Sequence, residues 1–427
     1  MSVTDMFKEF LANLKIDNSE QITSRYEEIT CCLNKKYRCS DAKTSNRLQI
    51  GSYGRWTAIK GISDLDMLYI MPNSKWYDYQ NSGGQSKLLK EIKDVIQRRY
   101  PTTEVKVDRL VVTVTFNNFY IEVQPVFELD DGNFQYPDTY DGGSWKITKP
   151  REEISAMKEF VDNKNNNLRC LCKMVRAWKN NHGIAMGGLL IDTLAYNFLN
   201  SNTYYDDKSF SYYNHLSKDF FEFLKDQGDQ DYYLALGSRQ QVKVKKKFQQ
   251  AAKKAYEMCL DAIDSGGNDI AYDKWRKIYG SAFPCRPKQL SESRAQLSYN
   301  FSNTEEFIED KYPIDIRYSF KLDCIVTQNG FRPFRLSSHT RRLSVNKRLN
   351  FVASDIDVPE PYIIKWKILN IGQEAERRDC IRGQILNDNG NKEKIESTSF
   401  TGDHLVECYV IKNNIVVAKE NIIVPIE

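Results

Sequence analysis

A glycine-serine pair followed by two alternating aspartates is the part of the sequence best suited to chemistry. Gly51 and Ser52 come first, and Asp64 and Asp66 follow in the run Ser63-Asp-Leu-Asp-Met. Because side chains alternate along a β-strand, both aspartates would project from the same face. Adjacent carboxylates can share magnesium ions, and a metal pair roughly 3.5 to 4 Å apart stabilises the attacking and leaving oxygens of an in-line displacement. The pattern predicts phosphoryl or nucleotidyl transfer.

The Gly-Ser pair strengthens the interpretation of the two aspartates as part of a phosphate site. Gly51 lets the backbone approach a phosphate closely, and Ser52 offers a hydroxyl and an amide donor in the same turn. An Asp-x-Asp pattern alone also fits ordinary surface carboxylates on an edge strand. The preceding turn, together with residues 68–70 continuing the strand, favours a triphosphate site at Gly51 and Ser52.

Such a site needs a third acid, and Glu122 is our candidate. Residues 109–127 read as a hairpin around an Asn117-Asn118 turn. Ile121 and Val123 would face the core and leave Glu122 on the opposite face. The same pattern also fits an ordinary solvated residue, and three nearby acids compete for the role: Glu128, Asp130 and Asp131.

A basic pair on a predicted helix offers a phosphate clamp. Residues 167–179 carry apolar side chains at helical spacing, namely Leu168, Leu171, Val175 and Trp178. Lys173 and Arg176 are three residues apart and share one face of that helix. A solvated basic stripe would give the same pattern.

Composition argues against a disordered chain and against a general nucleic-acid binder. The chain has 427 residues, 41% of them hydrophobic and 12% aromatic, which excludes global disorder. The formal charge of +4 is small beside 61 basic and 57 acidic residues, so it gives no support for a general nucleic-acid binder.

The basic run at residues 243–247, with Lys253 and Lys254, is predicted to be the solvated face of a helix. The other face of that helix would carry Phe248, Ala251, Ala252, Ala255 and Cys259.

No targeting, membrane-spanning, zinc-binding or redox pattern is found in the sequence. No stretch approaches 18 uninterrupted apolar residues, and residues 1–8 lack the features of a signal peptide. We therefore expect a cytoplasmic protein without membrane insertion. The ten cysteines and four histidines are scattered without zinc or redox spacing, so we expect reduced cysteines.

The chain divides into three expected parts. Residues 1–165 would form the catalytic core with N-terminal helices near 5–37, capped at Asn18-Ser19, and a helix over 86–100. Residues 166–300 would form a helical lobe that closes the nucleotide cleft, followed by a polar linker at 291–303. Residues 301–427 would form a small β-sandwich with strands at 314–326, 362–370, 404–411 and 415–424 and a turn at 387–391.

Several segments of the sequence together resemble one known family. In the N-terminal part these are Gly51-Ser52 with Ser63-Asp-Leu-Asp-Met, Ile121-Glu-Val-Gln-Pro-Val-Phe, and Asp141-Gly-Gly-Ser-Trp-Lys-Ile-Thr-Lys-Pro-Arg151. These segments look like those of the bacterial cGAS/DncV-like nucleotidyltransferases of anti-phage signalling systems. Residues 234–242 and 274–284 are similar to the helical part of that family's SMODS-type core. Three further segments look like the C-terminal AGS-C-like sensor module of one subgroup: residues 364–370, 374–378 and 381–385.

The resemblance implies an α+β fold with a polymerase-beta-like nucleotidyltransferase core, a helical lobe and a C-terminal β-sandwich. It implies two Mg²⁺ ions, for which Mn²⁺ can substitute, held by Asp64, Asp66 and Glu122. Many relatives use Asp as the third ligand, so Glu122 is a departure with a longer reach. A basic residue on the equivalent helix contacts the donor phosphates in the family, and Lys173 is the better match with Arg176 second. Gly187-Gly188 stands where relatives place a small polar residue, which leaves that contact unassigned.

The resemblance also implies what the enzyme makes. Nucleoside triphosphates would be joined into a cyclic or linear oligonucleotide second messenger, with pyrophosphate released, and the product would act on a separate effector protein. Some relatives with this module occur beside a small membrane effector, so a linear or deoxynucleotide product stays open. Nucleotidylation of a macromolecule also fits the sequence. A non-catalytic nucleotide sensor fits less well, because the acids Asp64, Asp66 and Glu122 are intact.

The C-terminal part either senses a ligand or merely packs on the core or mediates oligomerisation. A basic cluster could meet an anionic ligand: Arg332, Arg335, Arg341, Arg342 and Lys347. The loop at residues 374–378 could equally pair its own charges. Base and sugar preference, product length, the activating signal and the oligomeric state stay open.

Overall fold

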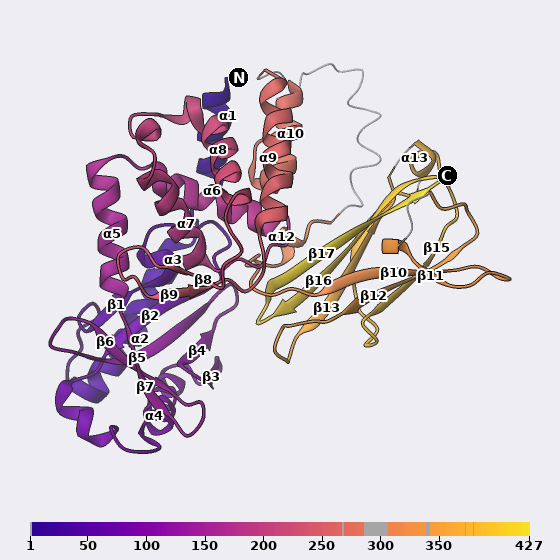
Figure 1. Ribbon diagram of the computed structural model, residues 1–427. Helices are drawn as coiled ribbons and strands as arrows, with labels where there is room; N and C mark the ends of the chain where they lie inside the picture. The colour runs from indigo at the N-terminus through magenta and orange to yellow at the C-terminus, as the bar shows by residue number, and fades with distance from the viewer. Residues whose placement is uncertain (1, 267–268, 286–305, 339–341, 372, 379) are drawn as a thin grey trace. The chain divides into compact units, whose positions relative to one another are not determined.

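The computed structural model describes residues 2–266, 269–285, 306–338, 342–371, 373–378 and 380–427 (Figure 1). The fold is mixed α+β, as the sequence predicts. The chain divides into two compact units. The first comprises residues 1–178 and 186–285, and the second comprises residues 179–185 and 286–427.

A seven-stranded mixed sheet forms the centre of the first unit, and its main path runs β1-β2-β5-β4-β3. β2 and β5 are parallel neighbours, whereas β4 pairs antiparallel with both β3 and β5. β6 pairs antiparallel with the end of β5 and also with β7. The hairpin predicted around residues 117–118 is confirmed as β4 and β5. The strands are β1 Arg47–Gln49, β2 Asp64–Ile70, β3 Glu104–Asp108, β4 Val111–Thr115, β5 Tyr120–Glu128, β6 Phe134–Asp138 and β7 Ser144–Thr148.

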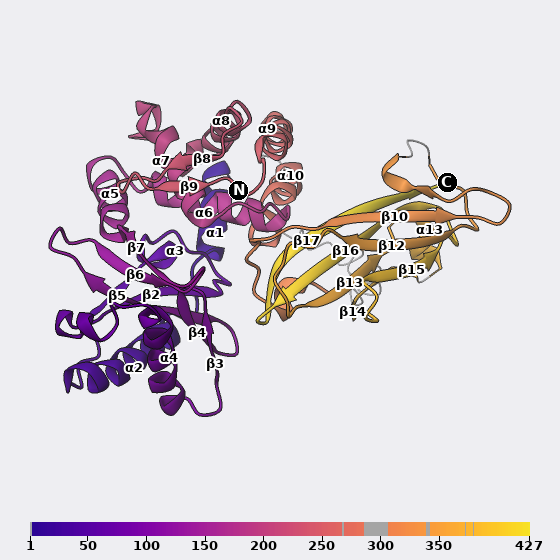
Figure 2. The ribbon, with the colours of Figure 1, turned by 60° about the horizontal axis from the view of Figure 1, so that its bottom comes forward.

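Two amphipathic helices cover one face of this sheet. They are α2, Ser19–Arg38, and α4, Gly84–Arg99, and Figure 2 shows both on the same side of the sheet. Leu65 and Met67 of β2 are fully buried in the core cluster that these helices complete. Leu68 joins a second cluster with Val126 and Phe134. Alternation along β2 therefore directs the even-numbered residues to the face opposite α2 and α4.

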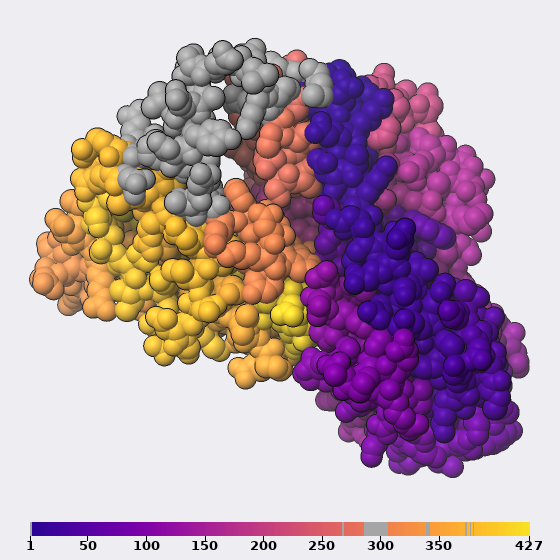
Figure 3. Space-filling view, turned by 180° about the vertical axis from the view of Figure 1, so that it is seen from behind, coloured from indigo at the N-terminus to yellow at the C-terminus, as the bar shows by residue number. Residues whose placement is uncertain are grey.

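The remaining helices of the first unit gather on the other side of the sheet (Figure 2). They are α1 Val3–Asn13, α3 Gly51–Gly54, α5 Pro150–Asn163, α6 Asn167–Asn181, α7 Gly188–Asn200, α8 Tyr213–Lys225, α9 Gln249–Asp264 and α10 Asp269–Tyr279. Phe7 of α1 makes edge contacts with Tyr213, Trp275 and Phe283. Figure 3 shows the indigo surface of α1 beside the pink and salmon surface of the later helices. Aromatic packing therefore joins the start of the chain to this helical group.

A small hairpin interrupts the helical part and corrects one prediction. β8, Tyr232–Leu234, pairs with β9, Gln241–Lys243. The basic run at residues 243–247 therefore ends a strand and enters a loop, and only Lys253 and Lys254 lie on the solvated face of α9. The prediction was wrong for the run because its lysines alternate with valine, which suits the short strand. Ala252, Ala255 and Cys259 form the buried face of α9, as predicted.

The second unit contains two antiparallel four-stranded sheets, ordered β11-β10-β12-β15 and β14-β13-β16-β17. β10 also contacts β17 of the other sheet, and Figure 2 shows the two sheets layered. The strands are β10 Lys321–Thr327, β11 Phe334–Arg335, β12 Arg348–Ser354, β13 Ile363–Leu369, β14 Arg382–Asn387, β15 Glu393–Ser397, β16 Gly402–Lys412 and β17 Ile415–Ile426. Three of the four predicted strands are confirmed as β13, β16 and β17.

The remaining predicted strand begins later than expected. β10 starts at Lys321 because the amides of Asp315, Arg317 and Tyr318 instead donate to the backbone carbonyls of Val416 and Val417. Ile316 packs there with Ile308 and Tyr409. The predicted linker at residues 291–303 lies outside the described residues.

Short helices complete the structure. They are α12 Ile308–Lys311, α13 Gln373–Arg377, and the 3-10 helices η1 Asn73–Asp78, η2 Thr203–Tyr205, η3 Phe210–Tyr212, η4 Gly280–Ala282 and η5 Leu336–Ser338. Over the ranges that the structure describes, every helix is too short or too polar to cross a lipid bilayer.

Candidate active site

The register of two parallel strands brings the predicted acids together. Asp66 of β2 is the direct partner of Glu122 on β5, and Asp64 is the partner of Tyr120. Paired residues on neighbouring strands project from the same face of a sheet. Asp64, Asp66 and Glu122 are half-buried and lie opposite the face covered by α2 and α4. Three carboxylates therefore share one face across two adjacent strands.

The competing acids lie elsewhere. Glu128 is the last residue of β5 and forms an ion pair with Arg151. Asp131 accepts hydrogen bonds from the backbone and side-chain nitrogens of Asn133, at 3.0 and 2.8 Å. Asp130 is exposed beyond the end of the strand. The register places Glu122, and none of these three, beside Asp66.

The donor set suits a hard cation that keeps some of its water. Within the part of the chain that the structure describes, no group of three or more His, Cys, Asp or Glu side chains is arranged to hold a metal ion. Magnesium in such sites is usually held by one or two carboxylates, with water and substrate phosphates completing the shell. Carboxylates on neighbouring strands fit that kind of partial shell.

The Gly-Ser turn lies directly against Asp66. Gly51 begins the four-residue helix α3 with φ of 65°, a conformation that favours glycine. A Cβ at this position would come 1.8 Å from Oδ2 of Asp66. The amide of Ile50 and the hydroxyl of Tyr26 both donate to the carbonyl of Asp66, at 3.1 and 2.8 Å. The turn and the acidic strand are therefore held in close contact.

A buried charge network anchors the end of this turn. Arg55 donates from Nε to Asp192 on α7 at 2.9 Å and from Nη1 to Glu153 on α5 at 3.0 Å. Thr57 donates to the same Asp192 oxygen at 3.0 Å, and Ser238 donates to Glu153 at 3.1 Å. Burial raises the pKa of Glu153, with Arg55 opposing the effect. No local pattern in the sequence pairs Arg55 with Glu153, so neither was predicted to belong to the site.

Arg176 belongs to the same network. Its two terminal nitrogens donate to both oxygens of Asp192, at 2.6 and 3.0 Å, and to the carbonyls of Cys172 and Gly188. Bidentate pairs of this kind are strong and directional. Burial alone would raise the pKa of Asp192, but Arg176 and Arg55 outweigh it and lower the pKa to about 2. Arg176 therefore links α6 to α7 through this buried ion pair.

Lys173 has different surroundings from Arg176, although both lie on α6. It is half-buried, and burial together with Arg169 and Arg176 lowers its pKa below the ordinary lysine value of 10.5. Among the described residues its ammonium makes no hydrogen bond or ion pair. A half-buried cation beside other cations is stabilised by an anion. Of the two predicted clamp residues, Lys173 is the one whose charge is available to a phosphate.

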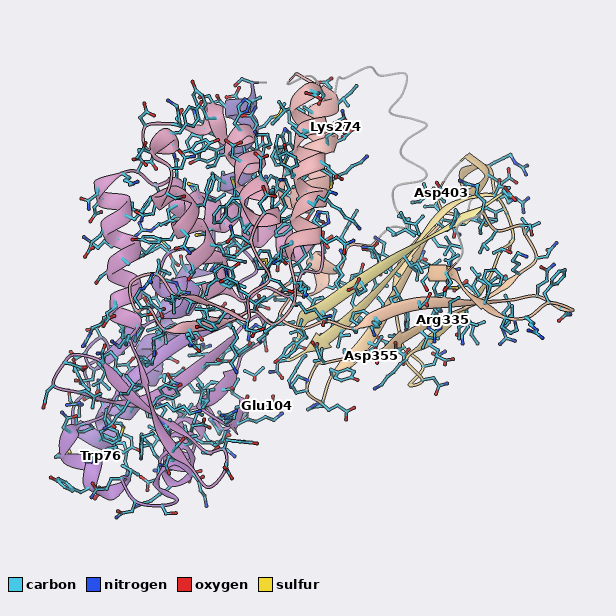
Figure 4. All side chains as sticks on the ribbon, in the orientation of Figure 1. Trp76, Glu104, Lys274, Arg335, Asp355 and Asp403 are labelled. Carbon is cyan, nitrogen blue, oxygen red and sulfur yellow. The ribbon has the colours of Figure 1, made fainter. Side chains whose placement is uncertain are left out.

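Three of the five basic residues predicted to meet a ligand in the second unit have local partners. Arg335 pairs with Asp323 at 3.1 Å, and Arg342 pairs with Asp403 at 2.5 Å; Figure 4 labels Arg335 and Asp403. Lys347 donates to the side-chain oxygen of Gln328 at 2.6 Å, and Arg341 lies outside the described residues.

Residues 374–378, expected to form a loop, lie largely in the short helix α13 and pair their own charges, which was the second interpretation of that segment. Glu374 forms ion pairs with Arg377 at 2.7 Å and with Arg378 at 2.5 Å. Exposed pairs between close neighbours of this kind contribute little to stability.

Comparison with family models identifies two long segments of the chain. Residues 1–160 match the Second Messenger Oligonucleotide or Dinucleotide Synthetase domain. Residues 302–427 match the Adenylyl/Guanylyl and SMODS C-terminal sensor domain. No curated protein matches the chain.

Several solved structures are similar to part of the chain. CdnC of Escherichia coli MS115-1, solved in complex with HORMA-deltaN, is 16% identical with a TM-score of 0.49, covering 66% of this chain and 98% of its own. A mutant of the Vibrio cholerae di-nucleotide cyclase DncV is 14% identical with a TM-score of 0.47, covering 66% and 87%. The Rhodothermus marinus CdnE c-UMP-AMP synthase is 13% identical with a TM-score of 0.43, covering 62% and 97%.

The acids, the turn and the basic helix lie in or directly after the segment that matches the synthetase model. The chain is a nucleotidyltransferase with a Second Messenger Oligonucleotide or Dinucleotide Synthetase domain at residues 1–160 and an Adenylyl/Guanylyl and SMODS C-terminal sensor domain at residues 302–427.

Proposed function

We propose that this chain is a magnesium-dependent enzyme that joins nucleoside triphosphates into an oligonucleotide second messenger and releases pyrophosphate. The observation that carries the proposal is the pairing of Asp66 with Glu122 on parallel strands, with the Gly51 turn against the same aspartate. A phosphate on this turn would lie next to the acids that bind its counterions. Mn²⁺ is expected to replace Mg²⁺.

In the proposed mechanism each residue has a defined part. Asp64 and Asp66 would hold both metal ions, and Glu122 the ion nearer the acceptor hydroxyl. When bound, the metal pair supplies charge neutralisation and activation of that hydroxyl. Gly51 and Ser52 would cradle the triphosphate, and Lys173 would steady it through its charge.

The reaction itself is a displacement at phosphorus. The acceptor hydroxyl oxygen forms a bond to the α-phosphorus of the donor, and the bond from that phosphorus to the bridging oxygen of the β-phosphate breaks. The hydroxyl proton passes to a carboxylate oxygen or to water, and pyrophosphate leaves. Positioning and electrostatics supply the catalysis, because the transferred group needs little covalent help.

The sensor domain supports a signalling role for the product. An enzyme with an attached sensor can make its product only when a stimulus is present. The synthetase model that matches residues 1–160 describes second messengers, either oligonucleotides or dinucleotides. We therefore propose a cytoplasmic role in anti-phage defence, with a cyclic or linear product that acts on a separate effector.

The direct test is product analysis with purified full-length protein. Each labelled ribo- and deoxyribonucleoside triphosphate, singly and in pairs, is incubated with magnesium or manganese, and products are resolved by chromatography and mass spectrometry. The control is the double variant Asp64→Asn/Asp66→Asn. A small phosphatase-resistant product that the control does not make supports the proposal. Labelled macromolecule would favour nucleotidylation instead, and nucleotide binding without turnover would favour a sensor.

A further inference from the structure

An exposed tryptophan in an unfavourable backbone conformation follows the Gly-Ser turn. Trp56 has φ of 58° and is 53% exposed. Bulky side chains rarely adopt the left-handed region, and such outliers persist where the surrounding structure fixes them. About half of this large side chain stays in solvent, so burial accounts for only part of it, and backbone preference disfavours tryptophan at this position.

Both neighbours of Trp56 are tied to one buried carboxylate. Arg55 and Thr57 are 4% and 0% exposed, and both donate to Oδ2 of Asp192, at 2.9 and 3.0 Å. The amide of Thr57 also donates to the carbonyl of Ser52 at 2.9 Å. The strained conformation is therefore fixed on both sides, and it directs the indole away from the network into solvent.

Arg169 joins this tryptophan to α6. Its guanidinium carbon lies 4.8 Å from the centroid of the Trp56 ring, within the range of a cation–π contact. Arg169 precedes Lys173 by one helical turn on α6. Its Nε is buried and has no hydrogen-bond partner among the residues that the structure describes. The pair spans the two elements to which the proposed function assigns the triphosphate, the Gly51 turn and α6.

We propose that Trp56 and Arg169 form a stacking platform for the nucleobase of a bound nucleotide. The guanidinium covers one face of the indole, and the exposed remainder of the ring offers a flat apolar surface. Bases stack on such rings with little regard to sequence, and an adjacent arginine adds a cation–π contribution. The platform would hold the base while Lys173 and the turn hold the phosphates. This inference rests on the proposed function for its choice of ligand.

Glycine at position 56 separates a binding role from a structural one. Trp56→Gly removes the ring and also relieves the left-handed conformation, which glycine adopts freely. A ring that only binds ligand can be lost in this way without a fall in melting temperature. A ring that the fold requires cannot. Trp56→Phe keeps an aromatic face, Arg169→Lys keeps the charge, and Tyr77→Ala removes another exposed ring, one that is 74% exposed.

The experiment measures dissociation constants by calorimetry for the full-length protein with magnesium chloride. The probes are the α,β-methylene analogues of ATP, GTP, CTP and UTP, which cannot be transferred, and tripolyphosphate, which has no base. We expect Trp56→Gly to weaken at least one analogue by about 5- to 100-fold and to leave the tripolyphosphate constant within about twofold. Its melting temperature should be unchanged or higher. Trp56→Phe and Tyr77→Ala should stay close to wild type, and Arg169→Lys should fall between.

Three results overturn the platform. They are unchanged binding of all four analogues, an equal loss for tripolyphosphate, and no binding of any analogue by the wild type. A failure of the proposed function looks different. In that case base-dependent binding would survive while product formation from natural triphosphates would be missing.

Discussion

A carboxylate oxygen of Asp66 occupies the space where a side chain of residue 51 would begin. A Cβ built on Gly51 would lie 1.8 Å from Oδ2 and 2.8 Å from Cγ of Asp66. Real Cβ atoms do not come so close, so any other residue at position 51 must move the acid. The contact makes the geometry of the turn and the geometry of the acidic strand depend on each other.

Gly51→Ala should therefore damage both stability and activity. Alanine at φ of 65° costs about 1 to 2 kcal/mol of folding free energy. Displacing Asp66 by about 1 Å is expected to lower product formation about 100-fold. Urea unfolding and the product assay measure the two effects. Gly228→Ala is the matched control, because a Cβ there meets nothing within 4 Å; equal activity of the two variants would contradict the prediction.

Lys173→Ala should weaken triphosphate binding. Losing one charge-assisted hydrogen bond of roughly 1.5 to 3 kcal/mol corresponds to about 10- to 100-fold in the dissociation constant. Calorimetry with the α,β-methylene analogue of ATP measures it. Lys253→Ala removes an exposed lysine from α9 and should bind like wild type. Similar binding by Lys173→Ala and wild type would remove Lys173 from the proposed site.

The lowered pKa of Lys173 also sets a pH dependence. Burial and the neighbouring arginines disfavour the charged form in the folded protein, so the ammonium loses its proton below the usual pH of about 10.5. Triphosphate affinity should fall as pH rises through that lower value. The folded state itself should gain stability over the same range, because the unfolded chain then binds more protons. Both slopes should be absent in Lys173→Ala.

Asp192→Asn should be among the most destabilising single substitutions in the first unit. It breaks the fully buried pairing with Arg176 and Arg55, and of these two arginines Arg55 keeps a second ion pair, with Glu153. Breaking a buried pair of this kind costs about 3 to 5 kcal/mol. Asp162→Asn, which breaks an exposed pair with Lys158, should change stability by less than about 1 kcal/mol. Thermal melts of the two variants that coincide would show that the network does not stabilise the fold.

Local patterns predicted the elements of the site. Alternation from Asp64 to Ile70 and the turn at residues 117–118 were sufficient for β2 and for the β4–β5 hairpin. Apolar spacing predicted α6, and Pro101 marked the end of α4 within two residues. Each pattern reflects which face of a single helix or strand is buried. The types of a few neighbouring residues are enough to determine that face.

Contacts between distant segments could not be predicted in the same way. The register that pairs Asp66 with Glu122 depends on how two strands align, and alternation alone does not fix it. Arg55 and Asp192 are 137 positions apart in the sequence. From the sequence alone, Arg176 looks like an exposed cation, because its carboxylate partner cannot be identified. The short strands β8 and β9 were missed because three residues carry too little periodicity.

Glu122→Gln tests the third acid directly. The substitution keeps the size of the side chain and removes the charge that would bind the metal, so product formation should fall at least about 100-fold. That factor corresponds to roughly 2.7 kcal/mol of transition-state stabilisation, within the several kcal/mol that metal catalysis supplies. Glu128→Gln is the matched control on the same strand, since its carboxylate faces Arg151 and not Asp66.

The two variants together decide which acid completes the site. If Glu122→Gln is inactive and Glu128→Gln retains activity within a few-fold, the register of β5 has identified the ligand. The reverse result would move the site toward the end of the strand and would disagree with the register. Glu122→Asp tests whether the length of the side chain matters, because removing one methylene draws the carboxylate away from the metal position. Activity of Glu122→Asp well above that of Glu122→Gln would show that charge, more than length, is what the site requires.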